Sequence, residues 1–190
     1  MRQAPSVFRP RDLDQVGLSR SRLRAMVRDG DAERVTRGLY RLRSAEVTEL
    51  ETVAAVSARI PGAIVCLLSA LAIHNIGTQL PREIWVALDR KARKPRVDDL
   101  PVRIVRFSGA MFRYGVETRI VEGVPVRITS PARTVVDCFR YRKKIGMDVA
   151  LEALKDALGD RRVKPDEIVR AAQVCRIYSV LRPYLEATLA

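Results

Sequence analysis

The chain has 190 residues, of which 47% are hydrophobic and 5% aromatic, and its formal net charge is +13. That length is enough for one large or two small domains with a sizeable core. The excess of positive charge favours a polyanionic partner, nucleic acid before membrane. The longest apolar run, residues 63–73, is too short to span a membrane, and no apolar signal core follows the N-terminus. We therefore expect a cytoplasmic protein with no membrane partner.

Residues that usually carry metal or nucleophilic chemistry are sparse. The three cysteines, Cys66, Cys138 and Cys175, are far apart in the sequence, which favours reduced, buried thiols over a disulfide framework or a zinc site. The single histidine, His74, lies in an apolar stretch where a packing role is expected. The glycines are scattered at turns and form no phosphate-binding loop. The sequence therefore predicts no catalytic residue, no metal and no cofactor.

The first segment, residues 7–17, is predicted to contain a helix, because Pro10 suits its first turn and Gly17 suits its end. A second helix is predicted from an N-cap at Ser19 to a C-terminal Gly30. Two short helices joined by a tight turn that contains glycine form the helix-turn-helix pattern.

The second helix has two chemically different faces. Three apolar residues repeat at helical spacing and form one apolar stripe: Leu23, Met26 and Val27. Three arginines four residues apart form a column on another face, with Ser21 beside them: Arg20, Arg24 and Arg28. Like charges at this spacing destabilise an isolated helix. Either a phosphate backbone offsets that repulsion or the arginines form a solvated surface.

Residues 32–42 are rich in strand formers, and Gly38 tolerates the positive φ of a tight turn, so a β-hairpin is predicted. A basic hairpin directly after a recognition-type helix is a wing, whose arginines would contact phosphates or a groove. Residues 1–43 contain 11 basic and 5 acidic residues, a net charge of +6. The DNA-binding site predicted from the sequence comprises Ser19, Arg20, Ser21, Arg24, Arg28, Arg34, Arg37 and Arg41.

Beyond the hairpin the pattern predicts a linker helix over residues 46–60 and then an α+β region. The expected strands cover 64–68, 83–88, 102–107, 117–121 and 124–128, with a short helix at 69–76 capped by Ser69. The expected C-terminal helices cover 131–144, 147–158, 165–174 and 177–189. Strands followed by helices indicate an α+β fold, in which helices cover a small sheet. The predicted organisation is a DNA-binding domain (1–43), a linker helix (44–62) and an α+β domain (63–190).

Two basic runs lie in the predicted α+β domain. The first is expected in a loop, either solvated or as a second anion-binding patch: Arg90, Lys91, Arg93, Lys94 and Arg96. The second, residues 140–144, is either another anion-binding patch or a solvated helix end whose cations meet the helix dipole.

Ser130 and Pro131 mark a helix start, and Arg133 and Asp137 lie four residues apart on that helix. An ordinary i,i+4 ion pair, worth a few tenths of a kcal/mol, is expected in preference to a functional Arg133.

Several stretches together resemble one known family. In the N-terminal part they are Gly17-Leu18-Ser19, the helix that follows it, and the hairpin 34–40. In the C-terminal part they are 68–74, 84–87, 128–137 and 180–185. These stretches, which extend over nearly the whole chain, resemble the AbiEi-type antitoxins of bacterial type IV toxin–antitoxin systems, found in abortive phage infection.

The resemblance implies a winged helix-turn-helix joined to an α+β antitoxin domain. It implies a repressor that binds double-stranded operator DNA at inverted repeats and so autoregulates the antitoxin–toxin operon. It also implies a nucleotidyltransferase-like toxin, encoded in the same operon, that the antitoxin counteracts. Family members usually have one more helix before the first one here, so either the start is truncated or the helix after the hairpin takes its place.

Two other interpretations remain open. The first is a nuclease-like α+β enzyme that the basic module directs to DNA; Asp89 and Lys91 are its nearest candidates, but a partner glutamate at short spacing is missing. The second is an interaction protein whose basic loops engage a toxin or RNA.

Overall fold

The computed structural model describes residues 7–10, 13, 17–36, 38–44 and 50–190. The described residues divide into two compact units. We call N-terminal unit the residues up to Gly62 with Val97–Leu100 and Thr118–Val126, and C-terminal unit the remainder. Each unit is described by itself.

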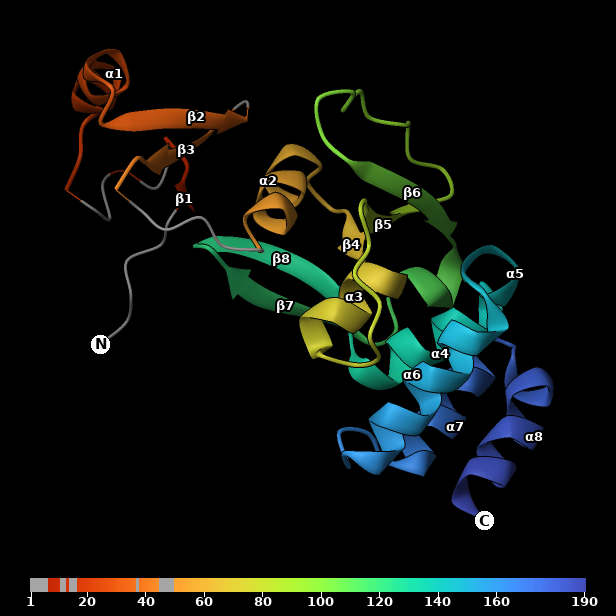
Figure 1. The fold of residues 1–190 in the computed structure, drawn as a ribbon. Helices are drawn as coiled ribbons and strands as arrows, with labels where there is room; N and C mark the ends of the chain where they lie inside the picture. Colours follow the sequence, from red (N-terminus) through yellow and green to blue (C-terminus); the bar gives the residue numbers. More distant parts are fainter. Residues whose placement is uncertain (1–6, 11–12, 14–16, 37, 45–49) are drawn as a thin grey trace. The chain divides into compact units, whose positions relative to one another are not determined.

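The N-terminal unit contains a three-stranded antiparallel sheet and two helices (Figure 1). Its elements in chain order are β1 (Val7–Phe8), α1 (Arg20–Asp29), β2 (Ala32–Thr36), β3 (Leu39–Leu42) and α2 (Glu51–Arg59). The strand order is β1-β3-β2. Helix α1 packs through Leu23 and Met26 against a core that contains Phe8, Ala32 and Tyr40. The apolar stripe of the helix therefore lies on one face of this sheet.

At the start of the segment in which a helix was predicted, Val7 and Phe8 instead form a strand that pairs with Arg41 and Tyr40 of β3. Residues 11, 12 and 14–16 lie outside the described residues, so the rest of that helix is not tested. The helix-turn-helix pair that depends on it stays a prediction.

The boundaries predicted for the next helix are confirmed. The Ser19 hydroxyl accepts a hydrogen bond from the Arg22 amide at 3.1 Å, and Gly30 ends α1 in the left-handed region at φ 85°. The predicted hairpin is also confirmed as β2 and β3, with Gly38 at φ 80°. The expected start of the linker helix falls on residues 45–49, outside the described residues, and α2 ends at Arg59 before Pro61.

The C-terminal unit is built on strands followed by helices, as the α+β prediction requires. The strands of its sheet are β4 (Ile64–Val65), β5 (Ile84–Asp89), β6 (Val102–Phe107), β7 (Val116–Val121) and β8 (Val124–Thr129). Residues 118–121 of β7 and 124–126 of β8 fall in the N-terminal unit as defined above. The helices are α3 (Leu67–His74), α4 (Pro131–Arg140), α5 (Arg142–Ile145), α6 (Met147–Gly159), α7 (Pro165–Val174) and α8 (Tyr178–Leu189). The sheet has the order β6-β5-β4-β8-β7. Strand β4 is antiparallel to β5 and parallel to β8, and β5 is parallel to β6.

Helix α4 is the central element of the C-terminal unit. It contacts α3, α6, α7 and α8, which gather around it in Figure 1. All residues from Arg133 to Phe139 are buried. Because these residues are buried on every side of the helix, their polar groups depend on partners within the protein.

Two predicted boundaries in this unit are corrected. The strand that begins at Ile64 ends at Val65, and α3 begins at Leu67, so Ser69 is not a helix cap. The Ser69 hydroxyl instead accepts a hydrogen bond from the Trp85 amide at 2.9 Å and so connects α3 to β5. The helix predicted over residues 131–144 is divided at Tyr141 into α4 and α5.

Candidate nucleic-acid interface

The N-terminus of α1 is held by its own serines. Besides capping the Arg22 amide, the Ser19 hydroxyl lies 2.9 Å from the Ser21 hydroxyl. Both side chains are exposed, and the helix has no acidic residue in its first turn. This end of α1 therefore offers hydroxyls, free amides and the positive end of the helix dipole, a combination that suits an anion.

The predicted arginine column is exposed along α1. Arg28 forms an exposed ion pair with Asp29, with Nε and Oδ1 2.9 Å apart. Arg20 and Arg24 form no ion pair with any residue that the structure describes. Their guanidinium groups are therefore not neutralised by a described carboxylate.

Arg20 and Arg24 line an open hollow of about 470 Å³ beside the sheet, whose remaining lining is mainly apolar: Pro10, Leu23, Val27 and Tyr40. Val27 belongs to the predicted apolar stripe with Leu23, but 38% of it is exposed, and it lines the hollow. Cationic groups thus border an apolar surface on α1. Arginine forks can pair with guanine edges or phosphates, and apolar side chains can contact a thymine methyl group.

The hairpin brings a further cation to the same side. In the β2–β3 register Arg34 is opposite Tyr40, so the two side chains share one face of the sheet. Tyr40 packs with the core beneath α1 and stacks on Phe8, with ring centroids 6.4 Å apart. Arg34 is exposed, and its Nε donates to the Thr36 carbonyl at 3.3 Å. Arg37, predicted at the hairpin turn, lies outside the described residues.

Arg41 is placed differently from the other predicted arginines. It is opposite Glu33 in the hairpin register, one residue along from Tyr40, and so lies on the opposite face of the sheet. Its Nη1 is 2.6 Å from Glu51 Oε2, and its Nη2 pairs with Glu33. These carboxylates raise the pKa of Arg41, the hydrogen bond to Glu33 having the largest effect. Only 16% of the Arg41 side chain is exposed, so these ion pairs give Arg41 a structural role, and its predicted DNA contact stays a prediction.

Four of the six residues that line the hollow were not among the predicted site residues: Pro10, Leu23, Val27 and Tyr40. Arg22 and Arg43 are further exposed cations of this unit. The alternation of side chains along a strand could have placed Tyr40 on the face of α1 and Arg41 on the opposite face.

The first basic run of the C-terminal unit lies in the loop between β5 and β6, as predicted, and its five cations are exposed: Arg90, Lys91, Arg93, Lys94 and Arg96. Arg106 Nη1 holds the start of this loop by donating to the carbonyls of Asp89, at 2.9 Å, and Ala92, at 2.8 Å. The Asp89 carboxylate accepts from the Lys91 amide at 2.8 Å and thus stabilises the turn. No ion pair joins these five cations to a carboxylate within the described part of the chain.

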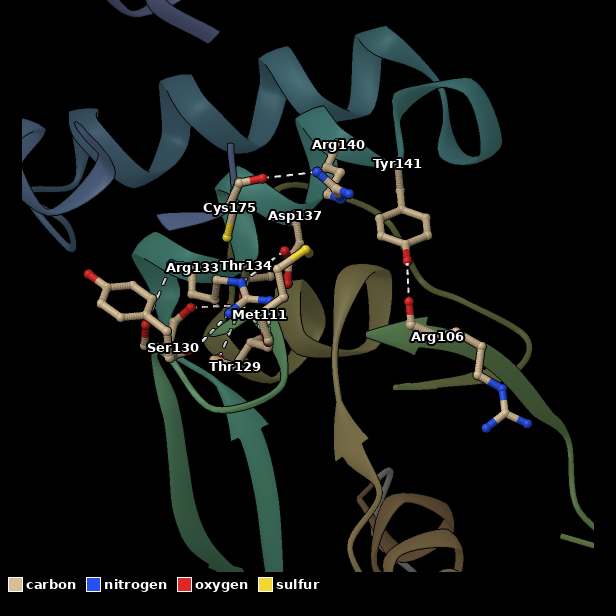
Figure 2. A network of polar contacts seen from close by, with 11 residues as sticks. Arg106, Met111, Thr129, Ser130, Arg133, Thr134, Asp137, Arg140, Tyr141 and Cys175 are labelled. Carbon is tan, nitrogen blue, oxygen red and sulfur yellow. Dashed lines mark hydrogen bonds and ion pairs between the residues drawn. The ribbon is translucent and has the colours of Figure 1, made fainter. Parts of the chain in front are cut away.

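Arg133 forms the most deeply buried polar network of the chain's described residues (Figure 2). Its Nε donates to Asp137 Oδ1 at 2.9 Å, and both side chains are fully buried. Its two terminal nitrogens donate to the carbonyls of Tyr114 and Met111, each at 2.7 Å. Gly115 is required beside it, because a Cβ there would lie 2.9 Å from Arg133 Cβ. The expected ion pair between Arg133 and Asp137 is therefore confirmed, but it is fully buried, whereas pairs of this kind were expected to be exposed or half-buried.

Burial dominates the ionisation of Asp137. It raises the pKa of Asp137 to about 6, although the neighbouring Arg133 acts in the opposite direction. Asp137 Oδ2 is buried and has no hydrogen-bond partner among the described residues. One oxygen of the Asp137 carboxyl is therefore hydrogen-bonded and the other is not. Because the pKa of Asp137 differs from its value in the unfolded chain, the stability of the fold depends on pH.

The remaining candidates for site chemistry have structural environments. Cys66, Cys138 and Cys175 are free, buried thiols, and burial raises the pKa of each. His74 Nε2 lies 2.7 Å from the Thr129 carbonyl in the core. Among the described residues, no three side chains of the metal-ligating types come together.

The geometry thus defines an α+β protein with a helix-and-hairpin module that presents arginines on one face. Residues 2–43 match a family model described as transcriptional regulators, AbiEi antitoxin, so the resemblance predicted from the sequence is confirmed for that segment. The match supports a DNA-binding regulatory role for this module.

Comparison of structures supports the fold of the whole chain. The crystal structure of the RV2827C protein from Mycobacterium tuberculosis matches with a TM-score of 0.61 at 17% sequence identity, covering 97% of this chain and 73% of that one. No curated protein matches the chain in sequence. None of the described helices is long and apolar enough to cross a membrane.

Proposed function

We propose that the chain is a DNA-binding transcriptional repressor of the antitoxin type, and that it acts by binding rather than by catalysis. The observation that carries the proposal is the pair Arg20 and Arg24, exposed beside an apolar hollow on α1. The family match over residues 2–43 supports the same role. In this proposal α1 is the recognition helix and the β2–β3 hairpin is the wing.

The proposed DNA contacts differ with the position and free hydrogen-bonding groups of each side chain. Arg20, Ser21 and Arg24 lie in the first turns of α1, the part of a recognition helix that reaches base edges. Arg28, Arg34 and Arg37 hold phosphates and fix the register without reading sequence. Ser19 acts by shaping the helix end, because its hydroxyl is used by Arg22 and Ser21. Arg41 stabilises the hairpin.

The basic loop of the C-terminal unit adds a sequence-independent contact. Its cations are exposed, and Arg106 orders the start of the loop. Phosphate contacts of this kind release counterions and so strengthen binding most at low salt. We assign the loop to phosphate rather than to base contacts, because it offers charge without an ordered helix or strand.

The regulatory role follows from the antitoxin resemblance. The repressor would bind inverted repeats upstream of its own operon and lower the transcription of that operon. The second product of the operon would be a nucleotidyltransferase-like toxin whose effect the antitoxin counteracts. A nucleotidyltransferase encoded immediately downstream would support this part of the proposal, and an unrelated neighbour would count against it.

A gel-shift titration tests the DNA-binding role directly. The probe is a duplex from the region upstream of the gene, and the matched control is a shuffled duplex of equal length and composition. We expect the upstream duplex to bind roughly 1000-fold more tightly, the lower end for specific binders. Equal affinity for both duplexes at physiological salt would overturn the repressor proposal.

A further inference from the structure

A second hollow lies in the C-terminal unit at the junction of α4 and α5. Its volume is about 410 Å³, within the range of small-molecule sites. Six residues line it, four of them cationic: Arg140, Tyr141, Arg142, Lys143, Lys144 and Ile177. The basic run 140–144 therefore borders an open, shallow hollow.

The two arginines are held in place by the backbone. Arg140 Nη1 donates to the Cys175 carbonyl at 2.9 Å, and Arg142 Nη1 donates to the Phe139 carbonyl at 2.9 Å. Each guanidinium keeps further N–H donors for a ligand, because arginine has five in all. Pre-positioned donors lose less side-chain entropy on binding.

The wall between these cations is Tyr141, shown with Arg106 and Arg140 in Figure 2. Its hydroxyl donates to the Arg106 carbonyl at 3.1 Å, and its ring packs on Phe107 with centroids 6.0 Å apart. Burial raises the pKa of Tyr141 to about 12, so the hydroxyl stays neutral and adds no negative charge to the hollow. Lys144 Nζ lies 5.7 Å from the centre of this ring.

None of these four cations forms an ion pair with a residue that the structure describes, although the buried Asp137 carboxyl interacts electrostatically with Arg140. The carboxyl end of α4 offsets only part of this charge, because a helix end carries roughly half a unit charge. An oligophosphate would balance the remaining positive charge. A terminal phosphate carries up to about −2 near neutral pH and each further linked phosphate about −1, so three linked phosphates carry about −4.

We propose that the hollow at the α4–α5 junction binds the oligophosphate group of a small anion, with Arg140 and Arg142 as fixed forks and Lys143 and Lys144 as mobile partners. The hollow and the concentration of charge in five residues favour a compact ligand over an extended backbone, which would suit the exposed 90–96 loop better. This site requires neither DNA nor the N-terminal arginines, so it stands apart from the repressor proposal.

The chain has six lysines, which can be replaced two at a time in matched double variants: Lys91 and Lys94, Lys143 and Lys144, and Lys155 and Lys164. Isothermal titration of the full chain with sodium tripolyphosphate, without DNA and at physiological ionic strength, measures the site. We expect K143Q/K144Q to weaken binding about tenfold or more, as losing charge-assisted hydrogen bonds requires. K155Q/K164Q removes equal charge from exposed sites elsewhere and should leave the affinity within about twofold, since distant exposed charges are screened.

Urea unfolding of each variant controls for loss of structure, and Arg142→Gln provides a second variant that must also weaken binding. Adenosine triphosphate and a 5′-triphosphorylated RNA, titrated in parallel, distinguish a free from an RNA-borne oligophosphate. No binding of tripolyphosphate to the unaltered chain, or equal losses in the two lysine pairs, overturns the proposal. A loss of duplex DNA affinity in K143Q/K144Q without tripolyphosphate binding would make the surface a nucleic-acid contact, which also overturns it.

Discussion

Arginine is used in opposite ways in the two units. In the N-terminal unit Arg20 and Arg24 are exposed and border a hollow, without a described carboxylate partner. In the C-terminal unit Arg133 is fully buried, and Asp137 and two backbone carbonyls accept its hydrogen bonds. An uncompensated exposed cation is available for an external anion, whereas a buried, satisfied one stabilises the fold.

The comparison shows that burial and partners, and not charge alone, separate the arginines that are available to an external anion from those that are held within the fold. Arg41 shows the same difference within the N-terminal unit. It lies in the basic hairpin, but like Arg133 it is largely buried and paired with carboxylates. The following predictions test that division, from the largest expected effect to the smallest.

Arg133→Met should lower the free energy of unfolding by about 3–5 kcal/mol, because it leaves the Asp137 carboxylate buried without its partner. Urea unfolding measures this change. The matched control is Arg182→Met, which removes the same i,i+4 arrangement from Arg182 and Glu186 where both side chains are mostly exposed. The control should change stability far less. Equal losses in the two variants would contradict the distinction.

The Asp137 carboxyl should make stability fall as the pH rises. Its pKa is raised from 3.8 to about 6, so folding favours its protonated form. The stabilisation is complete below the unfolded-state pKa and is lost as the pH rises through about 6. The difference in unfolding free energy between the unaltered chain and Asp137→Asn should therefore shrink between pH 4 and 6.5, by on the order of 3 kcal/mol. A difference independent of pH would show that Asp137 keeps one protonation state.

Arg41→Ala and Arg34→Ala should separate structure from binding within the hairpin. The first should lower the unfolding free energy by about 1–2 kcal/mol, because Glu51 loses its partner while only 11% of its side chain is exposed. The second should leave stability unchanged and reduce the slope of log affinity against log salt by about one, as expected for a phosphate contact. Urea unfolding and duplex titrations measure the two effects. The reverse pattern would show that the two assignments are exchanged.

The local elements of the fold were predictable because local rules determine them. Ser19 and Gly30 bound α1 as their capping preferences require, and the strand β6 occupies residues 102–107 as its alternation predicts. The segment 7–8 was missed because its strand exists only through pairing with β3. The Ser69 boundary was missed because this hydroxyl bonds to the amide of Trp85, a contact that no local pattern encodes.

The candidate site was likewise predictable only where local sequence patterns determine it. The spacing of four residues correctly predicted an exposed arginine column on α1. The burial of Arg41 depends on Glu51, ten residues further along the chain, and the burial of Arg133 depends on a carbonyl at Met111. Contacts between distant segments decide which cations remain available, and one sequence does not reveal them.

The central claim is that Arg24 reads DNA from the exposed face of α1. Gel-shift titrations of Arg24→Ala and of the matched Arg22→Ala, on the upstream and the shuffled duplex at several salt concentrations, test it most directly. Arg22 is exposed on the same helix but does not line the hollow, and a two-residue step places it on a different face. Arg24→Ala should weaken binding of the upstream duplex by about 1–3 kcal/mol and reduce its preference over the shuffled duplex. Arg22→Ala should retain that preference. Unchanged affinity and preference in Arg24→Ala would contradict the account.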